Sequence, residues 1–233
     1  GKDVSIVTFN DITREMENNE SESWTRLIRV LTHEIMNTVT PIASLSSALS
    51  QNLDAYDTED VRSALGTISS SSEGLISFVQ SYRSLTHIAA PVRKAFYLRD
   101  LVNDSVTIAQ ANWPSARVSY HELSEDIILY ADYGQISQVM NNLIKNAVQA
   151  GASDIDITAS IDKRERTVIN VANNGEPISE TGREQIFVPF YTTKGVSGTG
   201  VGLSLCRQII RLNGGTINLT SSTLEATVFT IVL

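Results

Sequence analysis

The strongest constraint on the fold is the spacing of apolar residues in two segments, 24–49 and 59–86, where steps of three and four alternate. This spacing predicts two amphipathic helices, each with an apolar seam along one side. Between them, Asp54–Thr58 favours a turn and a helix N-cap, so the two segments should form a helical hairpin. Two such helices make a thin core, and pairing of two copies into a four-helix bundle is the expected solution, which predicts a homodimer. The seam residues are Ile28, Leu31, Ile35, Thr38, Ile42, Leu45 and Leu49 in the first segment and Val61, Leu65, Ile68, Ser72, Leu75, Val79 and Tyr82 in the second.

Beyond Pro91 the sequence changes to a mixture of helix-like and strand-like segments. Apolar residues recur with helical spacing in some of them and alternate with polar residues in others. A polar, glycine-dotted stretch from Asn173 to Gly200 is expected as one long loop, and loops of that length usually serve a function. The predicted fold class is therefore a helical hairpin followed by an α/β sandwich. The expected helices are 98–111, 133–150 and 200–212, and the expected strands are 127–130, 155–161, 167–172, 216–220 and 227–233.

The net charge and the cysteine content exclude several classes of function. A formal net charge of −8 argues against a nucleic-acid partner, because phosphate backbones are bound by clustered lysine and arginine. No apolar stretch approaches the roughly 18 residues that a membrane helix needs, so we expect no membrane contact by this stretch of chain. Cys206 is the only cysteine, which excludes an internal disulfide and favours a reducing, cytoplasmic location. Its position in a predicted amphipathic helix favours a buried, inert thiol.

His33 is the histidine whose surroundings favour chemistry. It falls opposite the apolar seam, which excludes a core position and leaves an ordinary surface residue as the alternative. Glu34 follows directly and can keep one ring nitrogen protonated, so that the other is a nucleophile at neutral pH. Asn37 lies one turn further on the same side, where its amide can orient a water molecule. His87 ends the second helix, and His121 lies in a segment that is either strand-like or a loop. Both lack such neighbours, and we assign no special role to them.

Two asparagines four residues apart, Asn142 and Asn146, project from one face of a predicted helix. Amide oxygens suit Mg²⁺, which prefers oxygen ligands and keeps several waters together with substrate phosphates. Two ordinary surface asparagines are the alternative. The helix is otherwise mostly apolar at this point, and asparagine is a poor helix former, so a metal-binding role is favoured.

The run Gly198-Thr199-Gly200-Val201-Gly202-Leu203 precedes another predicted helix. Its glycines let backbone N–H groups approach phosphates, and the helix that follows offers its positive end. The run matches neither a Walker A loop nor a dinucleotide fingerprint, and a merely flexible loop is the alternative.

At the start of the long loop, Asn173 offers a side-chain carbonyl to an adenine amino group, with Gly175 close by in sequence. Phe187–Tyr191 is too apolar for free solvent and predicts a lid anchor that turns Thr192–Lys194 toward the phosphates.

Taken in order along the chain, these segments resemble the sensor histidine kinases of two-component systems. The resemblance extends from about Ser21 to Leu233 and implies a dimeric helical-hairpin domain followed by a Bergerat-type ATP-binding domain. The Thr-Pro-Ile and Phe-Tyr-Thr-Thr-Lys runs are most similar to nitrogen-regulation-type sensors. The corresponding segments are the H box (Leu31–Pro41), the N box (Asp132–Ala150), the G1 box (Asn173–Gly175), the F box (Phe187–Phe190) and the G2 box (Gly198–Gly202).

The resemblance implies domain limits and a reaction. Residues 1–20 would be the tail of a PAS-like domain with a linker, 21–91 the dimerisation and histidine phosphotransfer domain, and 92–233 the catalytic ATP-binding domain. The reaction would be ATP-dependent autophosphorylation, followed by transfer to an aspartate of a response-regulator receiver domain, with phosphatase activity toward that regulator as a further option. The resemblance leaves open whether the intact protein is anchored in the inner membrane.

Individual roles follow from the same resemblance. His33 would be the phosphoacceptor, Glu34 its orienting base, and Asn37 the residue that orients water for dephosphorylation of the partner. Asn142 and Asn146 would hold Mg²⁺. The residues expected to bind ATP are Asn142, Asn146, Asn173, Gly175, Thr193, Lys194, Gly198, Thr199, Gly200, Val201, Gly202 and Leu203.

The sequence departs from the family pattern in the G1 and H boxes. Asn173 stands where aspartate is usual, and Pro177 takes the place of the second G1 glycine. Thr38, rather than proline, follows Asn37, and the nearest proline is Pro41, so any bend of this helix should lie about one turn later.

Other classes of protein stay open at this stage. Gyrase-type and chaperone ATPases share the Bergerat fold but use a glutamate on the helix where this chain has Asn142. An anti-sigma-type kinase phosphorylates serine and lacks the hairpin. Asn173 permits a pseudokinase that dimerises and serves as a scaffold or phosphatase, which would take up no acid-labile phosphate.

Overall fold

The structure is a computed structural model that describes residues 32, 35–51, 57–193 and 200–233. The chain divides into two compact units, Gly1–Phe78 and Val79–Leu233, and each is described by itself. The PAS-like tail and linker predicted for residues 1–20 lie outside the described residues. Five of the predicted site residues lie outside them as well: His33, Glu34, Lys194, Gly198 and Thr199.

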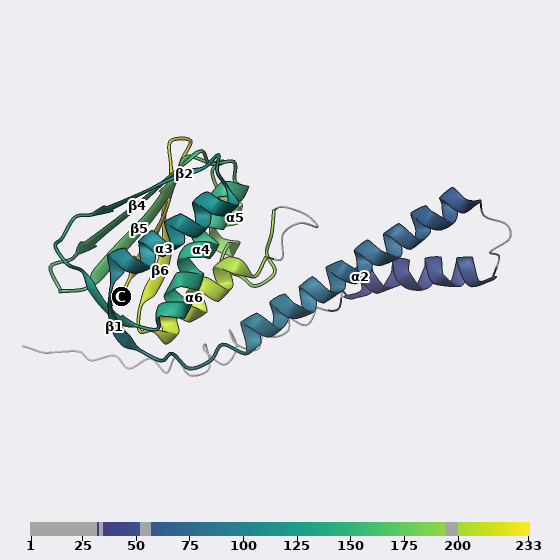
Figure 1. The fold of residues 1–233 in the computed structure, drawn as a ribbon, viewed down its shortest axis with the longest axis horizontal. Helices are drawn as coiled ribbons and strands as arrows, with labels where there is room; N and C mark the ends of the chain where they lie inside the picture. The colour runs from purple at the N-terminus through teal and green to yellow at the C-terminus, as the bar shows by residue number, and fades with distance from the viewer. Residues whose placement is uncertain (1–31, 33–34, 52–56, 194–199) are drawn as a thin grey trace, which may run out of the picture. The chain divides into compact units, whose positions relative to one another are not determined.

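The helical hairpin is present as predicted (Figure 1). Residues 35–51 are helical, and α2 spans Thr58–Thr86. The carboxylate of Asp57 caps α2, because one of its oxygens accepts from the N–H groups of Glu59 and Asp60 at 2.9 and 2.8 Å. Among the described residues between 35 and 78 no side chain is fully buried, and Leu65 on the predicted seam is 54% exposed. A single hairpin therefore leaves apolar surface uncovered.

The second unit is a mixed α/β sandwich, which confirms the predicted fold class. The central sheet has the strand order β2-β4-β5-β7-β6, in which β2 and β4 are parallel and the other neighbours are antiparallel. A separate antiparallel pair joins β1 to β3. Helices α3, α4 and α6 lie on one face of the sheet (Figure 1). The elements are β1 (Lys94–Tyr97), α3 (Leu98–Asn112), β2 (Arg117–Glu122), β3 (Ile128–Ala131), α4 (Tyr133–Gln149), β4 (Asp154–Ile161), β5 (Thr167–Asn173), α5 (Glu180–Gln185), α6 (Gly202–Leu212), β6 (Thr216–Ser222) and β7 (Thr227–Val232).

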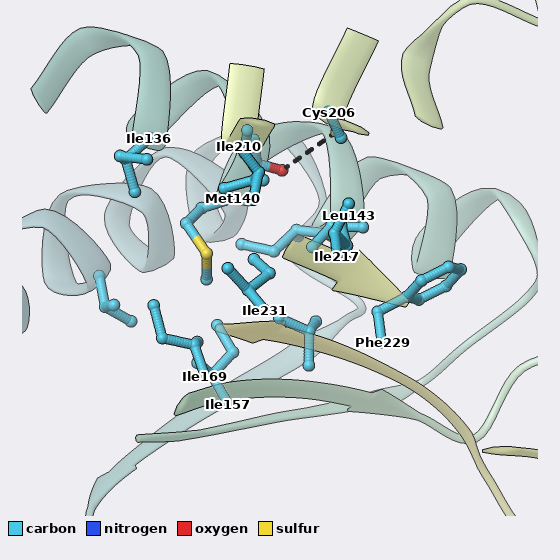
Figure 2. Close-up of a cluster of buried hydrophobic side chains, with 14 of the residues drawn as sticks. Ile136, Met140, Leu143, Ile157, Ile169, Cys206, Ile210, Ile217, Phe229 and Ile231 are labelled. Atoms are coloured by element: carbon cyan, nitrogen blue, oxygen red, sulfur yellow. Dashed lines mark hydrogen bonds between the residues drawn. The ribbon is translucent and has the colours of Figure 1, made fainter. Parts of the chain in front are cut away.

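The core of this unit lies between the sheet and α4 and α6. Alternate residues of β4 and β5 are buried, as expected for strands that turn one face to the interior. Figure 2 shows Met140 of α4 above Ile157 and Ile169 of the sheet, with Cys206 of α6 at the upper edge. Cys206 is fully buried, as predicted, and burial raises the pKa of its thiol to about 12, against the opposing effect of a hydrogen bond from the Asn142 side chain.

The structure differs from the sequence prediction in its short elements. The stretch from Asn173 to Gly200 was expected to be one irregular loop, yet α5 lies within it. Its N-cap is Ser179, whose hydroxyl accepts from the N–H of Gly182 at 3.1 Å. Strand β1 was not predicted, because its four residues carry no alternation. The segment around His121, which the sequence left open as strand or loop, is strand β2.

The start of α4 is fixed by Asp132, and its loss has a predictable cost. The Asp132 carboxylate accepts from the N–H of Gln135 at 3.0 Å and from the N–H of Val92 at 2.8 Å. We expect Asp132→Ala to lower the free energy of unfolding of this unit by about 1 kcal/mol. Urea unfolding measures the difference, and Glu125→Ala, which removes an exposed carboxylate elsewhere, is the matched control. An unchanged midpoint for Asp132→Ala would contradict the capping role.

The contribution of the Asp132 carboxylate to the stability of this unit depends on pH. Hydrogen bonds from the backbone N–H of Gln135, and then of Val92, hold the pKa of the Asp132 carboxyl below its ordinary value. Its contribution to stability is therefore present above the ordinary aspartate pKa and is lost as the pH falls through the lowered value. The stability gap between the wild type and Asp132→Ala should narrow in acid.

Candidate functional site

A cavity of about 470 Å³ opens in the second unit between α4, the segment that follows β5, and the start of α6. Its wall brings together residues that are far apart in the sequence, from position 142 to position 229. Polar groups and small residues predominate on the α4 and α6 side, and apolar side chains contribute to the sheet side. The principal described lining residues are Asn142, Lys145, Asn146, Gln149, Asn173, Glu176, Pro177, Ile178, Tyr191, Thr192, Thr193, Gly200, Gly202, Leu203, Thr227 and Phe229.

The two asparagines of α4 face the first residue of α6. A Cβ atom at Gly202 would lie 3.9 Å from Asn142 Oδ1 and 3.9 Å from Asn146 Nδ2, which is ordinary contact distance, so both amides lie next to this position. Asn142 thus has its side-chain oxygen on the Gly202 side. The helix therefore presents amide groups toward the N-terminal end of α6, where backbone N–H groups and the helix dipole favour anions.

The sheet side of the cavity is formed by the ends of two neighbouring strands. Asn173 ends β5 and pairs in register with Thr227, which begins β7. Asn173 is only 6% exposed, and Thr227 only 3%. The Thr227 hydroxyl lies 2.7 Å from the Ser222 hydroxyl, and the Ser222 hydroxyl in turn accepts from the N–H of Ile178 at 2.8 Å. These bonds hold the strand ends and the segment after Pro177 together at the inner end of the cavity.

The turn after β5 is held by Asn174 and leaves no room at Gly175. Asn174 Oδ1 accepts from the N–H groups of Ser153 and Asp154, both at 3.0 Å. A Cβ atom at Gly175 would lie 2.7 Å from the carbonyl oxygen of Ala150, closer than any side chain can approach. Glycine is therefore needed here for a close approach of two backbone segments.

A backbone contact joins Phe190 of the F box to Gly200, just before α6. The N–H of Phe190 donates to the carbonyl of Gly200 at 2.8 Å, and both residues have positive φ angles, of 64° and 63°. A Cβ atom at Gly200 would lie 2.7 Å from Phe190 Cα. Nearby, the rings of Phe187 and Phe229 meet edge to face with centroids 6.3 Å apart. The apolar segment predicted as a lid anchor is thus packed against the sheet.

Most of the predicted site residues that the structure describes line the cavity, and three do not. Asn142, Asn146, Asn173, Thr193, Gly200, Gly202 and Leu203 all line the cavity. Val201 is 3% exposed and precedes α6, and Gly175 lies in the buried turn behind Asn173; neither is among the lining residues. Asn37 lies in the first unit, where it is exposed.

Sequence reasoning missed several lining residues. Thr227 and Phe229 come from β7, and only the pairing of β7 with β5 shows that they belong to this cavity. Lys145 and Gln149 share the α4 face with Asn142 and Asn146, and helical spacing would have found both.

The chemistry of the cavity wall suits a nucleoside triphosphate bound together with a hard cation. Among the described lining residues only Lys145 and Glu176 carry a charge, and both are exposed. No group of three or more His, Cys, Asp or Glu that could hold a metal by itself occurs in the described part of the chain. Amide oxygens such as Asn142 Oδ1 fit a Mg²⁺ ion that takes its remaining ligands from phosphates and water.

Comparison with known proteins agrees with this geometry. Residues 131–233 match the family described as histidine kinase-, DNA gyrase B- and HSP90-like ATPases. The catalytic domain of the histidine kinase ThkA is 33% identical; the alignment covers 60% of this chain and 94% of that domain, with a TM-score of 0.55. The chain belongs to the sensor histidine kinase family. A longer structure of ThkA, solved in complex with the response regulator protein TrrA, covers 95% of this kinase chain at 26% identity, with a TM-score of 0.69.

Relatives of this sensor histidine kinase include proteins with different named roles. Nitrogen regulation protein NtrY of Azorhizobium caulinodans is 25% identical over 92% of this chain, and sporulation kinase D of Bacillus subtilis is 27% identical over 86%. The chain spans 29% and 40% of their respective lengths. The nitrogen-regulation subfamily stays a prediction, because relatives with other roles match equally well. Among the described residues, no helix of the kinase is long and apolar enough to cross a membrane.

Proposed function

We propose that this chain binds Mg·ATP in the cavity of its second unit and transfers the γ-phosphoryl group to His33. The observation that carries the proposal is the convergence of α4, α6 and the sheet on one cavity. Asn142 and Asn146 face Gly202 there, and Asn173 and Thr227 form the inner end. The amides and the N-terminal end of α6 suit the phosphates, and the buried strand ends suit a base.

The unprotonated ring nitrogen of His33 forms a bond to the γ-phosphorus, the bond from that phosphorus to the β,γ-bridging oxygen breaks, and ADP leaves with the electron pair. Glu34 would hold the proton on the other ring nitrogen. Asn142 and Asn146 would help to hold Mg²⁺, which neutralises phosphate charge when bound.

Two partners belong to the proposal. The hairpin helices leave apolar surface uncovered, with Leu65, Ile76 and Val79 each more than half exposed at 54, 58 and 52%, and a second copy of the chain would cover it. The solved complex of ThkA with a response regulator supports a receiver domain as the acceptor of the phosphoryl group. Asn37, which is exposed on its helix, would orient water for the reverse, phosphatase reaction.

ATP hydrolysis of the gyrase type is disfavoured by the composition of α4. This helix, Tyr133–Gln149, contains no aspartate or glutamate, and the residues it turns toward the cavity are amides, a lysine and an alanine. General-base activation of water needs a group that can take up a proton, which an amide cannot do. Transfer to a histidine needs no such base beside the nucleotide.

Nucleotide binding at this cavity is tested by comparing two asparagines of α4. We expect Asn146→Ala to weaken binding of ATP roughly tenfold in the presence of Mg²⁺, and much less in EDTA, because the lost amide would act through the metal and the phosphates. Asn141→Ala is the matched control, since Asn141 lies on the same helix but does not line the cavity. Equal affinities for the two variants would remove Asn146 from the site.

A further inference from the structure

The inner end of the cavity contains an amide that no hydrogen bond joins to a described residue. Asn173 lines the cavity and is only 6% exposed as a residue, yet its amide atoms are not among the buried, unsatisfied ones of the described residues. The amide is therefore open to the cavity, where a ligand or water can satisfy it. The group is therefore placed to bind the ligand of the cavity, and its chemistry should decide which ligands are accepted.

An amide can satisfy either of the two patterns that purine bases present. Adenine offers an N–H donor at position 6 and an acceptor at N1, whereas hypoxanthine and guanine offer an acceptor at position 6 and an N–H donor at N1. The side chain of Asn173 has one oxygen that accepts and one nitrogen that donates, and a half turn exchanges their places. A carboxylate has acceptors only. Opposite position 6 it accepts from the amino group of adenine and is repelled by the oxygen of a 6-oxopurine, so the contact at position 6 is the one that distinguishes the two side chains.

The surroundings do not fix the amide in one orientation. A Cβ atom at Gly175 would lie 3.0 Å from Asn173 Nδ2, so the glycine leaves room beside that nitrogen, and no hydrogen bond to a described residue holds it. Thr227, the register partner of Asn173, shares a hydrogen bond with Ser222 in which either hydroxyl can donate. The Thr227 hydroxyl can therefore donate to a ligand or accept from one, as the Asn173 amide can.

Within the described wall, no charged residue lies at the inner end to favour one base over the other. The charged residues of the described wall, Lys145 and Glu176, are both exposed, whereas Asn173 and Thr227 are buried. Selection between bases therefore depends on Asn173 and Thr227, which are neutral and can each act as a hydrogen-bond donor or acceptor.

We propose that this site accepts 6-oxopurine nucleoside triphosphates as well as ATP, because the Asn173 amide can turn either its oxygen or its nitrogen toward the edge of the base. The inference rests on the proposed nucleotide site and specifies its substrate class. Inosine triphosphate is the best probe, since it differs from ATP at position 6 and N1 only. Guanosine triphosphate adds an amino group at position 2 and so tests the space beside the base as well.

The test is competition binding of ATP and inosine triphosphate, with Mg²⁺, to the whole 233-residue chain and to its Asn173→Asp variant. The wild type should bind the two nucleotides within about tenfold of each other, whereas the variant should favour ATP by roughly 100-fold or more, because the oxygen at position 6 then faces a carboxylate. Asn173→Leu is the second variant and should bind both nucleotides equally weakly. Circular dichroism confirms that each variant is folded.

Each outcome bears on one claim. Strong preference of the wild type for ATP, equal to that of Asn173→Asp, would overturn the proposed base tolerance while leaving the nucleotide site intact. Failure of the wild type to bind ATP at all would overturn the proposed function itself, and with it this inference.

Discussion

Replacing His33 with glutamine is expected to abolish uptake of phosphate from ATP while leaving ATP affinity within about twofold of the wild type. The lone pair of an amide nitrogen is delocalised, so glutamine keeps the size and polarity of histidine without its nucleophile. Binding should persist because the cavity that we assign to ATP is lined wholly by residues of the second unit. Labelling with radioactive ATP and a fluorescent-nucleotide binding assay measure the two effects separately.

The other histidines supply the matched controls. His121 is exposed on β2, with Nε2 3.6 Å from an Asp156 oxygen, and His87 follows the end of α2. Both His121→Gln and His87→Gln should label like the wild type. Survival of the label in His33→Gln, or its loss in either control, would show that the acceptor has been assigned wrongly.

Gly200→Ala is expected to weaken ATP binding roughly 100-fold. A left-handed conformation costs an alanine about 1–2 kcal/mol, and the overlap of its Cβ with the backbone of Phe190 adds about 1–3 kcal/mol. We expect this strain to be relieved by displacement of the backbone at Phe190 and Gly200. About 1.4 kcal/mol corresponds to a tenfold change in affinity, so the summed strain energy suffices to weaken ATP binding by two orders of magnitude. The hydrogen bond from Phe190 N–H to the Gly200 carbonyl would then be lost. Isothermal titration with Mg·ATP measures the effect.

Gly134→Ala separates this effect from a general loss of glycine. Gly134 lies in the first turn of α4, where a Cβ atom would be in ordinary contact, 3.5 Å from an Asp132 oxygen. We expect this variant to bind ATP like the wild type and to be slightly more stable, because alanine favours a helix over glycine. Near-normal ATP binding by Gly200→Ala would show that the contact between Phe190 and Gly200 is not required for binding.

The long elements of the fold were predictable from local patterns. The alternating steps of three and four residues identified α2 to within a residue, and alternation identified β4 and β5, because each of these elements buries one face. The pattern left β2 open between strand and loop, because residues 117–122 contain only two apolar positions, Val118 and Tyr120, at the edge of the sheet. It failed for α5, which is too short for a period to emerge and depends on the Ser179 cap.

The candidate site was predictable where its residues share one element and less so where they do not. Asn142 and Asn146 could be paired from their spacing on α4, and Gly200 and Gly202 from the glycine run. Thr227 could not be found this way, because its position beside Asn173 depends on the register between β5 and β7. Strand register is set by long-range packing, which a local pattern does not contain.

The most direct test of the proposed reaction is the chemical stability of the phosphate bond that the chain forms. The purified chain is incubated with Mg²⁺ and ATP radiolabelled on its γ-phosphate, and the labelled protein is then challenged with acid and with base. The proposed transfer to His33 predicts label that is lost in acid and survives in base, as a phosphorus–nitrogen bond requires. Label that survives acid, or no label on a chain that still binds ATP, would contradict autophosphorylation on histidine.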